Sequence, residues 1–157
     1  MLLRREVLNR MKIIKKFFEY LFLFLFGGAA YYLIETAWRG YSHWTMFILG
    51  GICFLAIGPL NECLCWDSPI EFQATCGAAI ITFLELIVGI IVNLILQWDI
   101  WDYSDMPLNF LGQICLPFTL IWFILSYLII FLDDLLRWKL FNEEKPHYRS
   151  IFKGDRQ

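Results

Sequence analysis

The sequence predicts an all-α, polytopic membrane protein with four transmembrane helices. The chain is 59% apolar and 18% charged, whereas soluble domains average about 45–50% apolar and about 25% charged residues. Its mean hydropathy is +0.59, and four apolar runs each reach the roughly 20 residues that a helix needs to cross a bilayer core. This composition excludes a disordered chain, a basic nucleic-acid binder and a disulfide-stapled secreted module.

The four predicted spans fill most of the chain. They are residues 17–38, 43–62, 74–96 and 108–132. Backbone groups in lipid must pair within their own segment, which favours helices over open strands. With a basic tail at 1–16 and a second tail at 133–157, no stretch is left for a soluble domain, so we expect one membrane domain over residues 1–157.

The first apolar run has an alternative interpretation as a signal peptide. It has a basic start, an apolar centre at 21–26 and small residues at Gly28 and Ala30 that would suit cleavage. However, the apolar run continues to Ile34, beyond the usual length of a signal sequence. We therefore favour an uncleaved span.

The distribution of lysine and arginine predicts the orientation. Of the 13 basic residues, 12 lie in the two tails, and the remaining one is Arg39 in the short first loop. Basic residues concentrate on the cytoplasmic side of membrane proteins. Both termini are therefore predicted to be cytoplasmic, and the loop at 97–107, with three aspartates and no basic residue, is predicted to lie outside.

Two prolines are predicted to interrupt helices. Pro59 follows Gly58 and cannot donate a hydrogen bond to Leu55, so the second span should be kinked there. Pro117 should likewise kink the fourth span and free the carbonyl of Gln113.

The segment after the fourth span predicts a short amphipathic helix. Residues 133–141 mix leucine and phenylalanine with aspartate, arginine and lysine. Such a helix would lie along the inner membrane surface or dock a cytoplasmic partner.

An internal repeat is visible at a fixed offset of 62 residues. The stretch from Tyr41 to Cys53 recurs from Tyr103 to Cys115, with Gly50 matching Gly112. This pattern predicts two parallel helix pairs related by rotation about the membrane normal. The alternative is a chance similarity between two apolar sequences.

Glu85 is the most unusual residue, because it lies near the middle of the third span. A charge there costs at least about 2.5–3.5 kcal/mol, so Glu85 should face the interior of the bundle. Asn93 lies on the same helix face as Glu85. Gln113 and Asn109 on the fourth span are the expected partners of Glu85. Two interpretations stay open: a contact for an ion, proton or substrate, and an interhelical hydrogen bond that stabilises the bundle.

Other polar residues complete a candidate intramembrane site. Glu35 and Arg39 have the i, i+4 spacing of a salt bridge, and Glu62 closes the second span. The full candidate set is Glu85, Asn93, Gln113, Asn109, Glu35, Arg39 and Glu62.

The sequence predicts neither a metal site nor a cofactor site. Cys63, Cys65 and Cys76 offer three soft ligands, but a closed zinc site needs four, so we interpret them as free thiols. The chain contains no phosphate-binding loop, no His-Glu-x-x-His and no Gly-x-Ser-x-Gly. It is therefore not expected to be an enzyme, nor to hydrolyse ATP through the usual loop by itself.

Several short motifs together resemble one family. They are Arg39-Gly40-Tyr41-Ser42-His43-Trp44, Leu60-Asn61-Glu62, Trp101-Asp102-Tyr103-Ser104, Gly112-Gln113-Ile114-Cys115-Leu116-Pro117 and Glu144-Lys145-Pro146-His147-Tyr148. From about Tyr31 to Tyr148 the chain resembles bacterial membrane proteins described as ABC-transporter permeases of type IV. The resemblance implies a multi-pass subunit of the bacterial plasma membrane that a separate ATPase serves.

The leading hypothesis is thus a permease-like component of an ABC-type transport system. The alternative is a non-transporting scaffold or regulatory subunit for a partner protein. An intramembrane enzyme ranks third, because the chain offers no nucleophile–base pair. Expected partners are the lipid bilayer, a separate ATPase subunit and further copies of the chain, and no nucleic acid.

Overall fold

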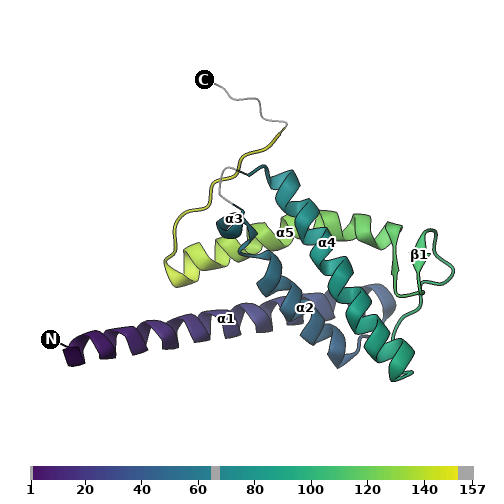
Figure 1. The fold of residues 1–157 in the computed structure, drawn as a ribbon, viewed down its shortest axis with the longest axis horizontal. Coiled ribbons are helices and arrows are strands. Elements are labelled where there is room, and N and C mark those ends of the chain that lie inside the picture. Colours follow the sequence, from purple (N-terminus) through teal and green to yellow (C-terminus); the bar gives the residue numbers. More distant parts are fainter. Residues whose placement is uncertain (1, 65–67, 152–157) are drawn as a thin grey trace.

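The computed structural model describes residues 2–64 and 68–151, with residues 2–4 described in backbone only. Its elements in chain order are α1 (Leu2–Arg39), α2 (Trp44–Ile57), α3 (Leu60–Cys63), α4 (Ile70–Gly89), the π-helix η1 (Ile90–Ile95), β1 (Asn109–Phe110), β2 (Ile114–Cys115) and α5 (Leu116–Phe141) (Figure 1). Four helical stretches are long and apolar enough to cross a membrane: Arg5–Arg39, Trp44–Cys63, Ile70–Ile95 and Leu116–Phe141. The prediction of a mostly helical chain with four candidate spans is confirmed.

The helices form two pairs that meet through α2 and α4. The α1 helix packs along α2, α4 packs along α5, and α2 also contacts α4 and α5. In Figure 1, α2 and α4 run diagonally across the roughly horizontal α1 and α5. The most buried span is α2, and the apolar core lies where it meets its neighbours, around Leu49, Ile57, Ile81 and Ile130.

Glycines bring α1 and α2 into close contact. A Cβ at Gly27 would collide with Phe54, and one at Gly50 would collide with Tyr31. Gly51 likewise packs against Phe24. In lipid, helices associate mainly through close packing, and small residues allow their backbones to approach. The glycines at this crossing therefore fix the first helix pair.

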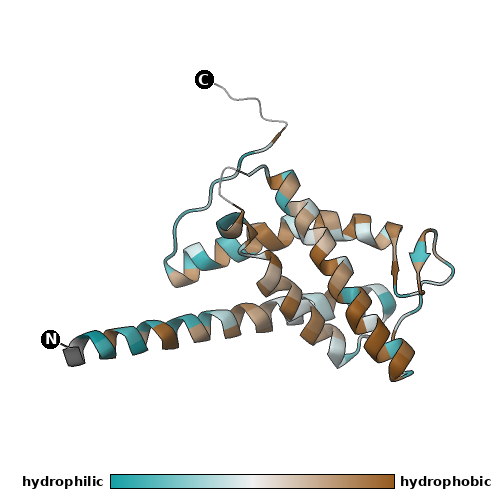
Figure 2. Ribbon diagram, viewed as in Figure 1, coloured by the Kyte–Doolittle hydropathy of each residue, from teal (hydrophilic) through white to brown (hydrophobic). Residues whose placement is uncertain are grey.

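The surfaces of the helices are apolar, as a membrane requires. Phe83 on α4 and Ile124 on α5 are each more than 60% exposed, and Figure 2 shows hydrophobic ribbon along most of α2, α4 and α5. The first turns of α1 mix hydrophilic and hydrophobic residues instead, and the segment after α5 is mostly hydrophilic. In a bilayer, acyl chains would cover the exposed apolar side chains.

The first helix is longer than the predicted span, because residues 2–16 of the basic tail continue it. Residues 2–16 contain neither proline nor glycine and are rich in leucine, lysine and arginine, which favour helix. With 38 residues at about 1.5 Å each, α1 is roughly 57 Å long. Its first turns project beyond the end of α5 (Figure 1).

The fourth span is shifted relative to the predicted 108–132. Residues 108–115 form a tight β-hairpin in which Leu108, Leu111 and Gly112 have positive φ angles, and α5 begins only at Leu116. Pro117 lies in the first turn of α5, where a helix needs no N–H donor. The predicted kink at Pro117 is therefore wrong, whereas the predicted interruption at Pro59 is confirmed by the break between α2 and α3.

The predicted amphipathic helix at 133–141 is also wrong as a separate element. These residues are the last turns of α5, and Asp133 and Arg137 are buried rather than at a membrane surface. The helix ends at Asn142, which adopts the left-handed conformation (φ 64°) common just after a helix. The chain then returns across the start of α4, where the amide of Ile70 donates to the carbonyl of Arg149 (2.9 Å).

The two segments that the internal repeat matches differ in secondary structure, and the arrangement as two parallel helix pairs stays a prediction. Gly50 lies within α2, where it packs against α1, but its match Gly112 lies in the hairpin turn with a φ of +67°. Similarly, Cys53 is helical, whereas Cys115 ends β2. The residue-by-residue match of Tyr41–Cys53 to Tyr103–Cys115 is thus wrong, because an extended hairpin replaces the first turns of a helix in the second half.

Candidate functional site

Glu85 lies in the interior of the bundle, as predicted. It is only 2% exposed and sits on the face of α4 that turns toward α5. One carboxylate oxygen accepts a hydrogen bond from the hydroxyl of Tyr103 (3.1 Å), and the other accepts one from the indole N–H of Trp122 (2.8 Å). Both donors are neutral. The predicted partners, Gln113 and Asn109, bind elsewhere.

Tyr103 reaches Glu85 because the loop between η1 and α5 folds inward. The Tyr103 ring stacks on Phe118 of α5 with centroids 4.5 Å apart, and its backbone amide donates to the carbonyl of Gly112 in the hairpin (2.7 Å). Burial and the nearby Glu85 carboxylate raise the pKa of Tyr103, so it stays a hydrogen-bond donor at neutral pH. Tyrosine commonly lies at the membrane surface, but the ring of Tyr103 is turned toward the core.

A cavity of about 110 Å³ lies beside Glu85. It is lined by Phe26, Gly27, Ala30, Tyr31, Ile34, Leu49, Gly50, Cys53, Phe54, Ile81, Glu85, Trp122, Leu125, Leu128, Ile129 and Leu132. These residues come from all four spans. The rings of Tyr31 and Trp122 form a tilted aromatic pair at the wall, with centroids 6.1 Å apart and an interplanar angle of 56°. Most of the lining side chains are apolar, and Glu85 is the charged one among them.

Asn93 and Gln113 lie together and hold the inward loop in place. The amide group of Asn93 donates to Gln113 Oε1 (2.8 Å) and to the carbonyl of Trp101 (3.0 Å), and its oxygen accepts from the amide of Ile100 (2.8 Å). Asn93 is in the π-helix η1, a geometry that is frequent at functional sites. These neutral bonds position the loop that carries Tyr103.

Glu35 and Arg39 form the predicted ion pair at the same end of the bundle. Glu35 also accepts a hydrogen bond from the hydroxyl of Ser42, and Arg39 donates to the carbonyl of Ile100 (3.1 Å). The pair therefore ties the end of α1 to both loops. Its bonds do not reach Glu85.

Two predicted residues lie outside this group. Asn109 is exposed in β1, where its amide donates to the carbonyls of Ser104 (3.0 Å) and Met106 (2.9 Å). Its predicted place on the fourth helical span is wrong, because the hairpin replaces the start of that helix. Glu62 is exposed in α3, at the opposite end of the bundle from Glu85, where it lines a polar cavity of about 390 Å³.

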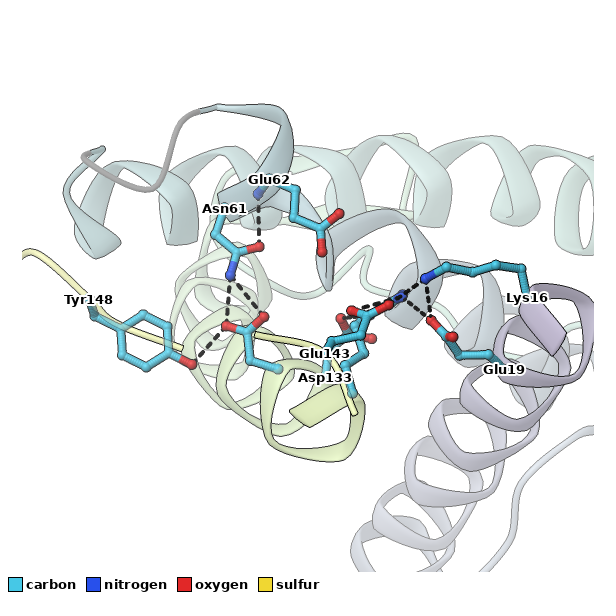
Figure 3. A network of polar contacts seen from close by, with 9 residues as sticks. Lys16, Glu19, Asn61, Glu62, Asp133, Glu143 and Tyr148 are labelled. Atoms are coloured by element: carbon cyan, nitrogen blue, oxygen red, sulfur yellow. Dashed lines mark hydrogen bonds and ion pairs between the residues drawn. The ribbon is translucent and has the colours of Figure 1, made fainter. Parts of the chain in front are cut away.

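A second polar cluster lies at that opposite end, and its centre is Arg137. Arg137 Nε donates to Asp133 (2.6 Å), and Nη1 donates to Glu19 of α1 (2.6 Å). Figure 3 shows Lys16 beside Glu19 and Glu143, and the Lys16 ammonium lies 2.9 Å from Glu19. Arg137, Asp133 and Glu19 are each no more than 3% exposed. We call these five residues the arginine network.

Three further residues extend the cluster toward the C-terminal segment. The amide of Asn61 donates to both carboxylate oxygens of Asp134 (2.8 and 2.7 Å), and the hydroxyl of Tyr148 donates to the same carboxylate (2.7 Å) (Figure 3). Burial and this carboxylate raise the pKa of Tyr148. Tyr148 thus holds the returning C-terminal segment against α5.

Sequence reasoning missed Tyr103, Trp122 and all five residues of the arginine network as site residues. The signal for the network was present: Asp133 and Arg137 have the i, i+4 spacing of a pair, and Glu19 interrupts an apolar run. No comparable local pattern marks Tyr103 or Trp122, which are 18 and 37 residues from Glu85.

The cysteines do not gather into a metal site within the described residues. Cys53 and Cys115 are buried, Cys63 is exposed and Cys76 is half-buried. Cys65 lies outside the described residues. In the described part of the chain, no group of three or more His, Cys, Asp or Glu side chains has the geometry to hold a metal ion.

Comparison with protein families identifies the family of this chain. The family model described as "Putative ABC-transporter type IV" matches residues 7–153, which is nearly the whole length. Searches of the curated proteins and of the solved structures found no match. The chain therefore belongs to this ABC-transporter type IV family, and with its four apolar helices it is a transporter-related membrane protein.

Proposed function

From this family membership, we propose that the chain is a permease-like membrane component of an ABC-type transport system. The observation that carries the proposal is a buried carboxylate, Glu85, at the wall of a cavity formed by all four spans. Acids inside membrane spans are rare, and each is a functional-site hypothesis by default. The chain lacks a nucleotide-binding loop, so a separate ATPase would supply the energy.

The decisive experiment is purification from native membranes into nanodiscs, followed by identification of the copurifying subunits. We expect an ATPase to copurify, and its ATP hydrolysis to fall in the Glu85→Gln variant while the subunit stays bound. Glu6→Gln, which removes an exposed acid of α1, is the matched control and should leave hydrolysis unchanged. A complex without any ATPase would contradict the proposal.

The proposed location is the bacterial plasma membrane with both termini in the cytoplasm. The asymmetric distribution of lysine and arginine supports this orientation. Reporter fusions after Gln157 and after Asp99 should report the inside and the outside, respectively. A C-terminus outside the cell would contradict the orientation.

One observation favours the alternative role as a scaffold for a partner protein. Beyond the bundle, α1 exposes Val7, Met11 and Ile14 along one face, at 52%, 61% and 55%. Their spacing of four and three residues suits helix–helix docking. Truncation of residues 2–14 would release the partner under this role, whereas an ATPase partner of the permease need not depend on that segment.

A further inference from the structure

The cavity beside Glu85 lies in a gap between α1 and α5. The two helices approach each other at two places, through Arg137 and Glu19 at one end and through the Trp122 and Tyr31 rings at the other. Between these two places, the walls of the gap between α1 and α5 are mostly apolar. The residues that α1 contributes there include Ala30 and Ile34, spaced four apart on one face.

The gap opens toward the lipid-facing surface. Ile34 and Leu128 line the cavity and yet are each 53% exposed. Side chains that belong to both the cavity and the surface mark its mouth. In a membrane that mouth faces acyl chains, so a molecule dissolved in the bilayer has direct access to the cavity.

The carboxylate at the inner wall has no counter-charge from the residues that bind it. Tyr103 and Trp122 donate neutral hydrogen bonds, and Arg39 is paired with Glu35. A buried carboxylate without a cation is costly. Glu85 therefore needs either a bound proton or a cation in addition to the two residues that donate hydrogen bonds to it.

The chemistry of the cavity wall selects the kind of cation. An inorganic ion requires several oxygen ligands, but Glu85 and the Tyr31 hydroxyl are the oxygen-bearing side chains among the lining residues described. The aromatic rings of Tyr31 and Trp122, which line the cavity, instead suit an organic ammonium group, because aromatic rings attract such cations. The remaining apolar wall suits alkyl substituents.

We propose that this cavity binds organic cations with an apolar body, such as alkylammonium compounds, which enter from the bilayer. The ammonium group lies in the cavity beside the Tyr31 and Trp122 rings and neutralises Glu85, and the alkyl part lies along α1 and α5. This inference rests on the proposed function, because it names the class of substrate that the permease would take.

The test is equilibrium dialysis of radiolabelled hexyltrimethylammonium against phosphatidylcholine nanodiscs that contain the full chain. Protein-free nanodiscs give the baseline for partition into lipid. We expect saturable binding of one cation per chain that 1-hexanol and NaCl do not displace. Glu85→Gln should weaken binding at least tenfold.

A matched pair of variants tests the site without changing its charge. Ala30 lines the cavity, whereas its neighbour Ala29 is exposed on another face of α1. Ala30→Phe should abolish binding by filling the cavity, and Ala29→Phe should bind as the natural chain does. Because Glu85 is intact in both, this pair decides the question even if Glu85→Gln does not fold.

Each other outcome overturns the inference. Non-saturable uptake, or equal uptake by Glu85→Gln and Ala30→Phe, would mean partition into lipid only. Displacement by NaCl would identify an inorganic cation site, and a folded chain that binds no cation would leave Glu85 protonated. The binding assay needs no ATPase, so its result is independent of the copurification experiment. Saturable cation binding by a chain with which no ATPase copurifies would refute the permease role but support the binding site. Copurification of an ATPase with a chain that binds no alkylammonium would refute the proposed class of ligand.

Discussion

Two buried acidic regions in opposite halves of the bundle compensate their carboxylates in different ways. In the arginine network, Arg137 lies between Asp133 and Glu19 and supplies charge from within the chain. At the other end, Glu85 receives only neutral hydrogen bonds. Removing one partner of a buried ion pair is costly because the other charge is left alone. We therefore expect the network to stabilise the fold, and the proposed ligand site assigns Glu85 a different role.

The largest loss of stability is expected when the guanidinium at the centre of the network is removed. Arg137→Ala leaves the carboxylates of Asp133 and Glu19 buried without it, which should destabilise the protein by about 3–5 kcal/mol. Thermal unfolding in nanodiscs would measure this. Lys139→Ala, which removes an exposed cation two residues later on α5, is the control and should cost less than about 1 kcal/mol.

A rescue experiment extends this prediction. The triple variant with Glu19→Gln, Asp133→Asn and Arg137→Gln removes all three charges together, so it should recover much of the stability that Arg137→Ala loses. If Arg137→Ala unfolds at the same temperature as the natural chain, the network does not stabilise the fold and the comparison fails.

Glu85→Leu should have an intermediate effect. It leaves the hydroxyl of Tyr103 and the indole N–H of Trp122 without an acceptor, at about 1–3 kcal/mol for each buried group. Glu85→Gln keeps an acceptor and should cost about 1 kcal/mol or less, because no buried cation loses its partner. The thermal unfolding of both variants in nanodiscs measures the difference. Destabilisation of Glu85→Gln as large as that of Arg137→Ala would show that Glu85 is charge-paired.

Asn93→Ala should release the inward loop rather than unfold the bundle. It removes the amide that binds both Trp101 and Gln113 and the oxygen that binds Ile100, so we expect a loss of about 1–3 kcal/mol. Hydrogen exchange should become faster at the Ile100 amide but stay unchanged in the middle of α2. Uniformly faster exchange across the four spans would contradict a role confined to the loop.

The smallest effect is expected for Glu143, at the edge of the network. Partial burial acts to raise the pKa of Glu143, but the hydrogen bond and charge of Lys16 and the charge of Arg137 lower it below its ordinary value of 4.5. A lowered pKa in the folded state stabilises the protein at pH values above the ordinary pKa. This stabilisation is lost as the pH falls through the lowered pKa of the folded state.

The Lys16 side chain is half exposed, so Glu143→Gln should cost less than about 1 kcal/mol at pH 7. Unfolding measured from pH 7 to pH 3.5 should show the natural chain and the variant converging at the acidic end. A difference that grows on acidification would have the wrong sign for this ion pair.

Local patterns in the sequence predicted much of the fold but less of the site. Span number, the Glu35–Arg39 pair and the break at Pro59 depend on residues within a few positions of one another, and they were predicted correctly. Pro117 was ambiguous, because proline suits both a kink and the first turn of a helix. The hairpin before it was missed for this reason.

The contacts of Glu85 could not be predicted in the same way. Burial of Glu85 follows from the cost of a charge in lipid, but its partners depend on how the loop folds back. Tyr103 lies in a loop whose aromatic residues suit a membrane surface equally well. Only the packing of the hairpin against α5 turns that ring toward Glu85.

The bond between Arg137 and Glu19 also has a consequence for biosynthesis. The two residues are 118 positions apart, so at about 5–20 residues per second the ribosome needs roughly 6–24 s to make the second after the first. During that interval the first hairpin is already emerging with an acid in its apolar stretch. Lys16, three positions before Glu19 and within 2.9 Å of it, is made first and can act as an interim counter-ion until Arg137 arrives.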